Sequence, residues 1–173
     1  LELREGERHA IIGPNGAGKT TFFNLITGHL LPSSGTVMFE GKDITGMVPH
    51  KLVRLGVARS FQRINIYPRM TVFENVQVAL IARDNNHFNL FSLGEPHNRQ
   101  DTKELLELVG LVEEAPEIAG ELSYGKQKQL ELAIALAENP RVLLLDEPTA
   151  GMSPQETTEA IALVDRITKD RGL

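Results

Sequence analysis

Residues 13–20 read Gly13-Pro14-Asn15-Gly16-Ala17-Gly18-Lys19-Thr20. This spacing matches the phosphate-loop pattern G-x-x-x-x-G-K-[ST], in which backbone N–H groups surround a phosphate. The apolar segment 9–12 before the loop predicts a strand, and the segment after it predicts a helix that Gly28 ends. A strand, a loop and a helix in this order are typical of α/β folds that bind phosphate at a helix N-terminus. The alternative, a glycine-rich turn that carries Lys and Thr by chance, does not explain this context.

The side chains after the glycines have the chemistry that a bound triphosphate needs. Lys19 is placed to bind the β- and γ-phosphates, the Thr20 hydroxyl to bind Mg²⁺, and Thr21 to bind the α-phosphate. We therefore expect a nucleoside triphosphate and Mg²⁺ as ligands. The candidate phosphate-binding residues are Gly13, Pro14, Asn15, Gly16, Ala17, Gly18, Lys19, Thr20 and Thr21.

Two carboxylates follow a second apolar strand. Val142–Leu145 is apolar at every position, which predicts a central parallel strand with both faces covered. Asp146 and Glu147 come directly after it, at the edge where open α/β sheets bind ligands. Asp146 can hold Mg²⁺, and Glu147 can accept a proton from a water that attacks the γ-phosphate. By itself an Asp-Glu-Pro sequence is a polar turn, but the phosphate loop in the same chain favours the catalytic interpretation.

Helix and strand signals alternate along the rest of the chain. Capping boxes at Thr71 and Ser153 predict two helix starts, and Ser123 predicts a third. The largely helical stretch 65–125 is too long for a single crossover and is expected to form its own lobe. The other expected elements are strands over 36–39 and 57–61, helices over 49–55, 103–109 and 123–138, a helix that ends at Gly172, and a loop over 83–99.

Composition excludes several classes of protein. The 173 residues carry a net charge of −5 with 5% aromatics, which fits one globular domain and argues against a nucleic-acid surface. The absence of cysteine excludes a disulfide framework, a thiolate zinc site and a thiol nucleophile. No apolar run suggests a membrane span and no signal peptide is visible, so a cytosolic protein fits best. Both ends of the sequence fall abruptly within or beside expected elements, so we expect a piece of a longer chain.

Three further segments point to one family. Leu122-Ser123-Tyr124-Gly125-Lys126-Gln127 begins a helix, Phe61-Gln62 follows a short strand, and residues 149–153 follow the acidic pair. With the phosphate loop, this order resembles the nucleotide-binding subunits of ABC transporters over essentially the whole chain. The resemblance implies ATP as the nucleotide. It also implies an α/β fold of the P-loop NTPase class, with a central mainly parallel sheet, a small antiparallel β part and a helical subdomain.

The same resemblance implies a division of the chain and roles for further residues. Residues 1–64 and 126–173 would form two parts of a nucleotide-binding core, and 65–125 a helical subdomain. Ser123 and Gly125 match the family's signature, which faces the γ-phosphate of ATP held by a second subunit. Gln62 matches the Gln that contacts Mg²⁺ or the attacking water. The simpler alternatives are an ordinary N-cap for Ser123 and a solvated side chain for Gln62. The implied catalytic residues are Glu147, Gln62 and Lys19, and the implied metal ligands are Thr20, Gln62 and Asp146.

Narrower features suggest a subfamily and its partners. Tyr124, the segment 59–62 and the segment 71–76 look like the branched-chain amino-acid importer ATPases, although lipopolysaccharide-export ATPases share parts of the pattern. The resemblance implies a second ATP-binding subunit, identical or paralogous, and no nucleic acid. It also implies transmembrane permease subunits that contact the region Ile64–Met70, at the cytoplasmic face of the membrane. A small satellite core is the alternative for the apolar side chains of that region.

Some positions depart from the family pattern. Lys126 stands where many members have Gln, and Ser153 where the interface loop usually carries Asp or Asn. None of the five histidines fits the family's switch His, and that His and the base-stacking aromatic are expected outside residues 1–173. We therefore expect this chain by itself to be a weak or inactive ATPase. Two other functions stay open: a soluble ABC-type ATPase for DNA repair, translation or cluster assembly, and a nucleotide-gated module that does not hydrolyse ATP.

Overall fold

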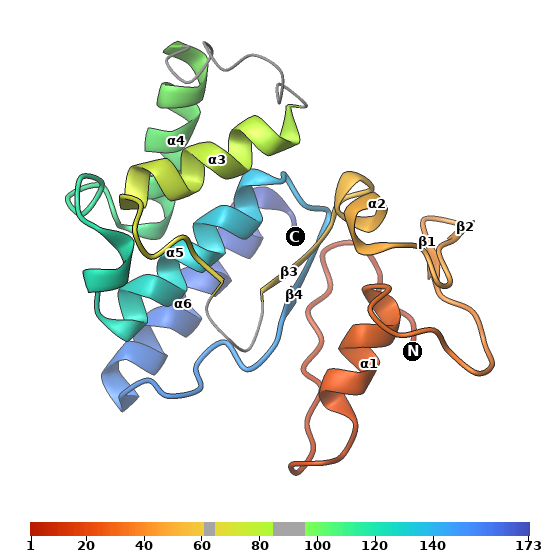
Figure 1. Cartoon of the computed structure of the whole chain (residues 1–173). Coiled ribbons are helices and arrows are strands. Elements are labelled where there is room, and N and C mark those ends of the chain that lie inside the picture. Colours follow the sequence, from red (N-terminus) through yellow and green to blue (C-terminus); the bar gives the residue numbers. More distant parts are fainter. Residues whose placement is uncertain (61–64, 85–95) are drawn as a thin grey trace.

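The computed structural model describes residues 1–60, 65–84 and 96–173, with side chains 96 and 97 excepted. Figure 1 shows four helices, α3 to α6, gathered on one side of the molecule. The helices α1 and α2 and a small hairpin lie on the other side, and two strands, β3 and β4, run between the two groups. The phosphate loop comes directly before α1, and the acidic residues 146–147 come directly after β4.

The two central strands are parallel. β3 (Val57–Ser60) pairs with β4 (Val142–Leu145), with Val57 opposite Val142 and Ser60 opposite Leu145. The predicted parallel pairing of the apolar strand is thus confirmed. All four residues of β4 are half-buried, whereas the sequence predicted that both faces would be covered. The difference arises because, among the described residues, β4 has β3 as its one strand neighbour.

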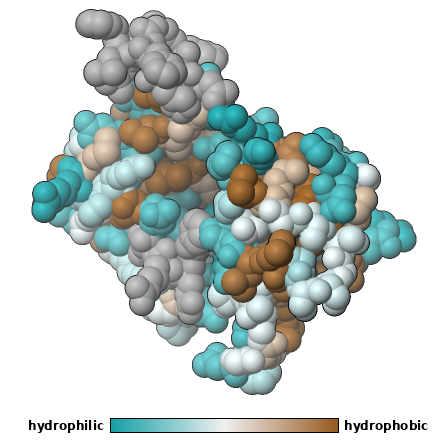
Figure 2. Space-filling model, turned by 45° about the vertical axis from the view of Figure 1, so that its right-hand side comes forward, coloured by the Kyte–Doolittle hydropathy of each residue, from teal (hydrophilic) through white to brown (hydrophobic). Residues whose placement is uncertain are grey.

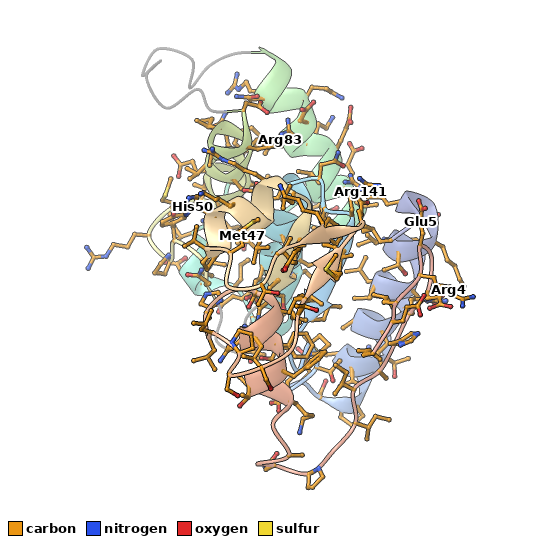
Figure 3. All side chains as sticks on the ribbon, turned by 90° about the vertical axis from the view of Figure 1, so that its right-hand side faces the viewer. Arg4, Glu5, Met47, His50, Arg83 and Arg141 are labelled. Atoms are coloured by element: carbon orange, nitrogen blue, oxygen red, sulfur yellow. The ribbon has the colours of Figure 1, made fainter. Side chains whose placement is uncertain are left out.

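An ion pair connects a short antiparallel hairpin to this sheet. β1 (Met38–Phe39) and β2 (Lys42–Asp43) pair through a turn at Glu40 and Gly41, which both have positive φ. The Arg141 guanidinium, just before β4, forms a two-point ion pair with the Glu40 carboxylate, and one N–H···O distance is 2.6 Å. Figure 3 shows Arg141 on the side of the molecule that faces the hairpin. The structure therefore contains the small antiparallel β part that was expected.

Apolar packing among four helices makes the main core. The helices α3 (Val72–Arg83), α4 (Pro96–Val109), α5 (Tyr124–Ala137) and α6 (Pro154–Arg171) contribute to it, together with a 3-10 turn at Ala119–Glu121. Leu80, Leu130 and Ile167 are fully buried in this core. Capping boxes at Thr71 and Ser153 begin α3 and α6, as the sequence predicted. Side-chain oxygens thereby accept from backbone N–H groups that the helix itself leaves unpaired.

A second, smaller core lies near the phosphate-loop helix. Ile44, Leu52 and Val57 form it, with Leu52 contributed by α2 (Pro49–Arg54). α1 (Lys19–Ile26) ends at Thr27, and Gly28 follows with φ of +70°. A Cβ at Gly28 would lie 1.9 Å from the Met47 carbonyl oxygen, so only glycine fits this close approach. The sequence-based end of this helix is confirmed.

Three predicted elements differ in the structure. Residues 9–12 form no strand within the described ranges, and Ile12 is 92% exposed. An apolar run predicts a strand only where a partner edge lies beside it, and none of the described strands pairs with this segment. α4 begins at Pro96, so part of the expected loop 83–99 is helical, and β1 is shorter than the expected strand 36–39.

The face of the molecule in Figure 2 carries both apolar and polar residues. Figure 2 shows apolar atoms in several separate patches among hydrophilic ones on the face that it presents. Leu31 is 78% exposed, which is normal for single apolar side chains at a protein surface. Within the described ranges, no helix combines the length and the apolar character that crossing a membrane requires.

Candidate functional site

The phosphate loop is built around two left-handed glycines. Gly16 and Gly18 have φ of +84° and +87°, a region that other residues adopt at a cost, and Gly18 is the N-cap of α1. A Cβ at Gly13 would lie 3.0 Å from the Ala17 Cβ, so the loop is compact where it starts. The loop glycines therefore have the conformational role that the sequence pattern predicted.

The Lys19 side chain folds back onto the phosphate loop. Its ammonium group donates to the carbonyl oxygens of Gly13, at 2.7 Å, and Pro14, at 3.1 Å. Thr20 and Thr21 follow in the first turn of α1 and are exposed. An anion at this point would meet a positive ammonium group, two hydroxyl groups and the positive end of the helix dipole. The loop residues fit a phosphate group in charge and in donors.

Asp146 lies at the end of β4 and is almost fully buried. Its side chain is 3% exposed, and its Oδ2 accepts from Arg59, at 2.8 Å. Arg59 lies on β3 and also donates to Asn24 and Thr27 at the other end of α1 from the phosphate loop. One guanidinium group thus joins the acidic strand end to the phosphate-loop helix.

Glu147 adopts an unusual backbone conformation. Its φ is +50°, in the left-handed region that residues with a Cβ rarely occupy. The residue is half-buried, directly after the strand. Left-handed residues that are not glycine occur where surrounding structure holds them, often at functional sites. The two neighbouring residues therefore differ in burial, since Asp146 is buried and Glu147 is half-buried.

The residues present also fit Mg²⁺ that arrives with a nucleotide. Among the described residues there is no cluster of three or more His, Asp and Glu that could hold a metal by itself. Mg²⁺ sites in nucleotide enzymes use one or two protein oxygens together with phosphate oxygens and water. Thr20 and Asp146 can supply such oxygens, whereas Gln62 lies outside the described residues.

The signature segment begins α5. The Ser123 side chain accepts from the Lys126 N–H at 3.4 Å, so Ser123 is the N-cap, the simpler alternative named above. Ser123 is also exposed, which leaves it accessible from outside the chain. A Cβ at Gly125 would lie 2.9 Å from Oε1 of Glu156, and one at Gly151 would lie 3.4 Å from the Tyr124 ring. The start of α5 and the start of α6 are therefore close neighbours.

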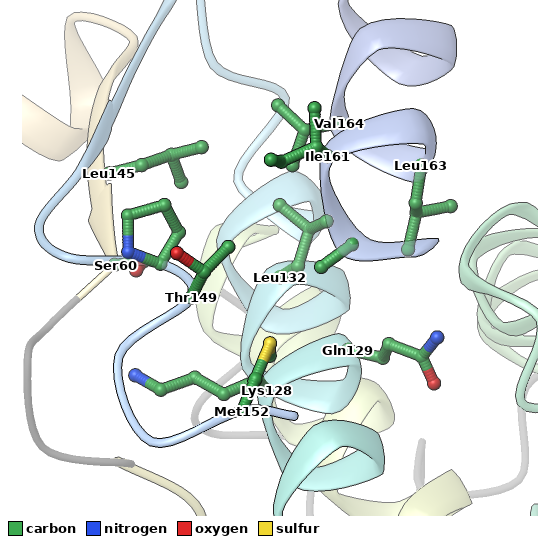
Figure 4. A pocket seen from close by; sticks show the side chains of 12 residues that line it. Ser60, Lys128, Gln129, Leu132, Leu145, Thr149, Met152, Ile161, Leu163 and Val164 are labelled. Carbon is green, nitrogen blue, oxygen red and sulfur yellow. The ribbon is translucent and has the colours of Figure 1, made fainter. Parts of the chain in front are cut away.

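A small apolar cavity lies behind the acidic strand end. Its volume is about 100 Å³, and Figure 4 shows Leu145, Thr149 and Met152 on one side and Ile161 and Val164 on α6. Lys128 also lines it, and its ammonium group pairs with Glu131 at 2.9 Å, with both side chains 5% exposed. The lining includes no phosphate-loop residue. Leu145 and Pro148, which directly flank Asp146 and Glu147 in the sequence, do line it.

The structure connects some predicted site residues and leaves others apart. Asp146 is linked to α1 through Arg59, whereas Ser123, which is exposed, and Gly125, which is half-buried, lie at the start of α5. Arg59 was not predicted as a site residue. A charged residue in the otherwise apolar and small strand sequence Val57-Ala58-Arg59-Ser60 was the available signal, because a buried charge needs a partner.

Comparison with known proteins gives three kinds of match. A family model described as ABC transporter matches residues 1–150. The chain is 38% identical to the high-affinity branched-chain amino acid transport ATP-binding protein BraF of Pseudomonas aeruginosa, over 100% of this chain and 71% of that protein. It is 40% identical to LivG of Escherichia coli, which has the same description, over 95% of this chain and 67% of that protein.

Solved structures are similar over the same length. An ATP-binding cassette of an ABC transporter in its ADP conformation matches with a TM-score of 0.83 and 34% identity, over 98% of this chain and 68% of that one. A dimeric ATP-binding cassette in a post-hydrolysis state, bound to ADP and Pi, matches with a TM-score of 0.80 and 28% identity, over 99% of this chain and 74% of that one.

Proposed function

The chain belongs to the ABC transporter family, and we propose that it is the ATP-hydrolysing subunit of an importer for branched-chain or related amino acids. The observation that carries this proposal is the similarity, along nearly the whole chain, to two branched-chain amino acid transport ATP-binding proteins. The phosphate loop also supports the proposal, because its sequence pattern, its positive charge and its hydrogen-bond donors suit a bound triphosphate.

In this proposal the phosphate loop and α1 bind the triphosphate of ATP. Residues 13–21 surround it with backbone N–H groups, and Lys19 leaves the loop carbonyls to bind the β- and γ-phosphates. Thr20, Asp146 and Gln62 would hold Mg²⁺, which when bound would supply positive charge to the transferred phosphoryl group. The carbonyl contacts of Lys19 keep its ammonium group beside the loop before ATP arrives.

Glu147 acts as the general base. Its carboxylate accepts a proton from the water that attacks the γ-phosphate, and Gln62 orients that water. Asp146 and Glu147 can divide the work because their surroundings differ: Asp146 is buried against a guanidinium, and Glu147 is half-buried on a left-handed backbone.

A second ATP-binding subunit completes each site. Ser123 and Gly125 at the exposed start of α5 contact the γ-phosphate of ATP that the partner's loop holds. The helix start offers N–H groups and a hydroxyl to that phosphate. Closure with ATP and opening after hydrolysis then shift the equilibrium of the membrane subunits. The region Ile64–Met70 receives those subunits at the cytoplasmic face of the membrane.

The experiment that tests the catalytic assignment replaces Glu147. We expect Glu147→Gln to abolish measurable ATP hydrolysis, because the amide cannot accept the proton from the attacking water. ATP binding should persist in this variant. Hydrolysis is measured as phosphate release, and binding by calorimetry with Mg-ATP. The control is Glu159→Gln, an exposed glutamate on α6, which should hydrolyse ATP at the wild-type rate. Unchanged phosphate release by Glu147→Gln would contradict the general-base role.

The transport assignment has its own test. Co-purification of the natural protein with transmembrane subunits supports an importer, and branched-chain amino-acid uptake that requires Glu147 supports the substrate class. Salt-sensitive binding to nucleic acid would favour a soluble ATPase instead. A complete lack of ATP hydrolysis by the wild-type protein would favour a nucleotide-gated module.

A further inference from the structure

Arg59 is the charged group at the junction of three elements. It lies on β3, its side chain is 7% exposed, and its neighbours come from α1 and from the end of β4. Lys and Arg side chains are rarely this buried unless they are paired. The contacts of this guanidinium therefore explain why the strand tolerates it.

The two terminal nitrogens of Arg59 serve different elements. Nη1 donates to the Asn24 side-chain oxygen, at 2.6 Å, and to the Thr27 hydroxyl, at 3.2 Å. Nη2 donates to the Asp146 carboxylate, at 2.8 Å. The guanidinium carbon also lies 5.6 Å from the centre of the Phe23 ring, within the range of a cation–π contact. One rigid, planar group thus fixes the distance between α1 and Asp146.

We propose that Arg59 is a positioning residue that fixes the Asp146 carboxylate relative to α1 and thereby sets the affinity for the Mg²⁺ that accompanies the nucleotide. This inference rests on the proposed function, because it takes Asp146 as a metal ligand. A carboxylate that binds a metal is itself oriented by hydrogen bonds, and removal of such a partner lowers metal affinity. Arg59 supplies that hydrogen bond and anchors it to the helix that follows the phosphate loop.

Lysine cannot replace Arg59 in this role. The guanidinium offers donors at fixed angles from two nitrogens, whereas an ammonium group is a single point at the end of a flexible chain. An ammonium group has no second nitrogen at a fixed distance, so it lacks the planar connection between Asn24 on α1 and Asp146. Arg59→Lys therefore keeps the charge and loses the link, which separates positioning from simple neutralisation of Asp146.

The test measures ADP binding, which needs no hydrolysis. Calorimetry gives the dissociation constant of ADP in the presence of Mg²⁺ and in the presence of EDTA. The ratio of the two constants, which we call the Mg²⁺ advantage, measures how much Mg²⁺ strengthens ADP binding. We expect Arg59→Lys to reduce the advantage that Mg²⁺ gives by about tenfold, and to leave binding in EDTA within about twofold. The control is Arg171→Lys, an exposed arginine in the last turn of α6, which should leave both constants unchanged.

A second pair of variants tests the path through Asp146. In an Asp146→Asn background, Arg59→Lys should reduce the Mg²⁺ advantage no further, since residues that act together are not additive. Asn24→Ala keeps Arg59 and Asp146 but removes the 2.6 Å anchor on α1, so it should lower the Mg²⁺ advantage in the same direction. Circular dichroism establishes that each variant is folded.

The outcomes separate this inference from the proposed function. If the wild-type protein binds ADP without any dependence on Mg²⁺, the assignment of the metal ligands fails and this inference fails with it. If the wild type depends on Mg²⁺ but Arg59→Lys weakens binding equally with Mg²⁺ and with EDTA, Arg59 serves the fold alone. An unchanged ratio in Arg59→Lys would overturn the positioning role while the proposed function stands.

Discussion

Lys126, in the first turn of α5, is paired with a carboxylate of its own chain. Its ammonium group forms a close ion pair with the Glu114 carboxylate. The hydrogen bond from Lys126 holds the pKa of Glu114 below its usual value, and the same bond raises the pKa of Lys126. The side chain that departs from the family's signature is therefore directed to its own chain.

Replacement of Lys126 should change how Glu114 titrates. In Lys126→Gln we expect the pKa of Glu114 to rise toward the ordinary glutamate value, because the largest cause of the lowered pKa is removed. A lowered carboxylate pKa stabilises the folded state above the ordinary pKa of the unfolded chain, and this contribution disappears as pH falls through the lowered value. The stability difference between wild type and variant should therefore shrink on acidification.

The measurement is an NMR titration of the Glu114 carboxyl carbon, with urea unfolding at several pH values. The control is Lys103→Gln, which removes an ammonium group from the exposed pair of Lys103 with Glu107 on α4. This control should leave the pKa of Glu114 unchanged. Identical Glu114 titrations in wild type and Lys126→Gln would show that the ion pair does not exist in solution.

Single residues were predictable where local chemistry decides their role. The left-handed glycines of the phosphate loop follow from the loop pattern, because N–H groups can surround a phosphate only with such backbone angles. Arg59 was not predictable as a partner of Asp146, because the two residues meet only when β3 and β4 pair. The sequence therefore indicated that Arg59 is a buried charge, but it did not indicate that Asp146 is its partner.

At the scale of elements, the start of α3 is fixed by side chains as well as by packing. The Thr71 hydroxyl accepts from the Glu74 N–H at 3.1 Å, and the Glu74 carboxylate accepts from the Thr71 N–H at 2.8 Å. Each bond satisfies a backbone donor that the first turn of a helix leaves unpaired. The capping box therefore helps to decide where α3 begins.

Removal of this cap should destabilise the protein by a modest amount. We expect Thr71→Ala to lower the free energy of unfolding by about 1 kcal/mol, the usual cost of losing a threonine N-cap. Urea unfolding followed by circular dichroism measures the change. Ser33→Ala serves as the control, since Ser33 is exposed in a bend outside the helices and strands. Equal stability of Thr71→Ala and the control would mean that packing alone sets the start of α3.

The helix starts that have a capping box were predicted well, whereas the strand over 9–12, which depends on a distant partner, was not. The starts of α3 and α6 are confirmed because capping boxes are local. The strand expected over 9–12 is wrong because a strand needs an edge to pair with, which no local pattern supplies. The helix expected over 103–109 begins earlier, at Pro96, because its first turn is polar and lacks the apolar period.

For the whole molecule, stability depends on the core shared by α3, α4, α5 and α6. Leu130 on α5 is completely buried in it, whereas Leu31 is 78% exposed. We expect Leu130→Ala to lower the free energy of unfolding by about 2–5 kcal/mol, because it removes buried methyl groups and leaves a cavity. Leu31→Ala should change it by less than about 0.5 kcal/mol. Similar urea midpoints for the two variants would contradict the assignment of the core.

The class of the molecule could be predicted from a few motifs, because phosphate chemistry demands particular residues at particular spacings. The family is confirmed by the comparisons. The position of Gln62 lies outside the described residues, so its role stays a prediction, as does the division into core and helical subdomain. Contacts between two copies of the chain are beyond what a motif specifies, since they depend on surfaces built from distant segments.

The most direct test of the central claim is a structure of the natural protein that carries Glu147→Gln, determined with Mg-ATP. We expect a dimer in which each triphosphate lies in the phosphate loop beside Lys19, with Ser123 of the second copy at the γ-phosphate. Nucleotide bound away from residues 13–21, with that loop empty or collapsed, would contradict it.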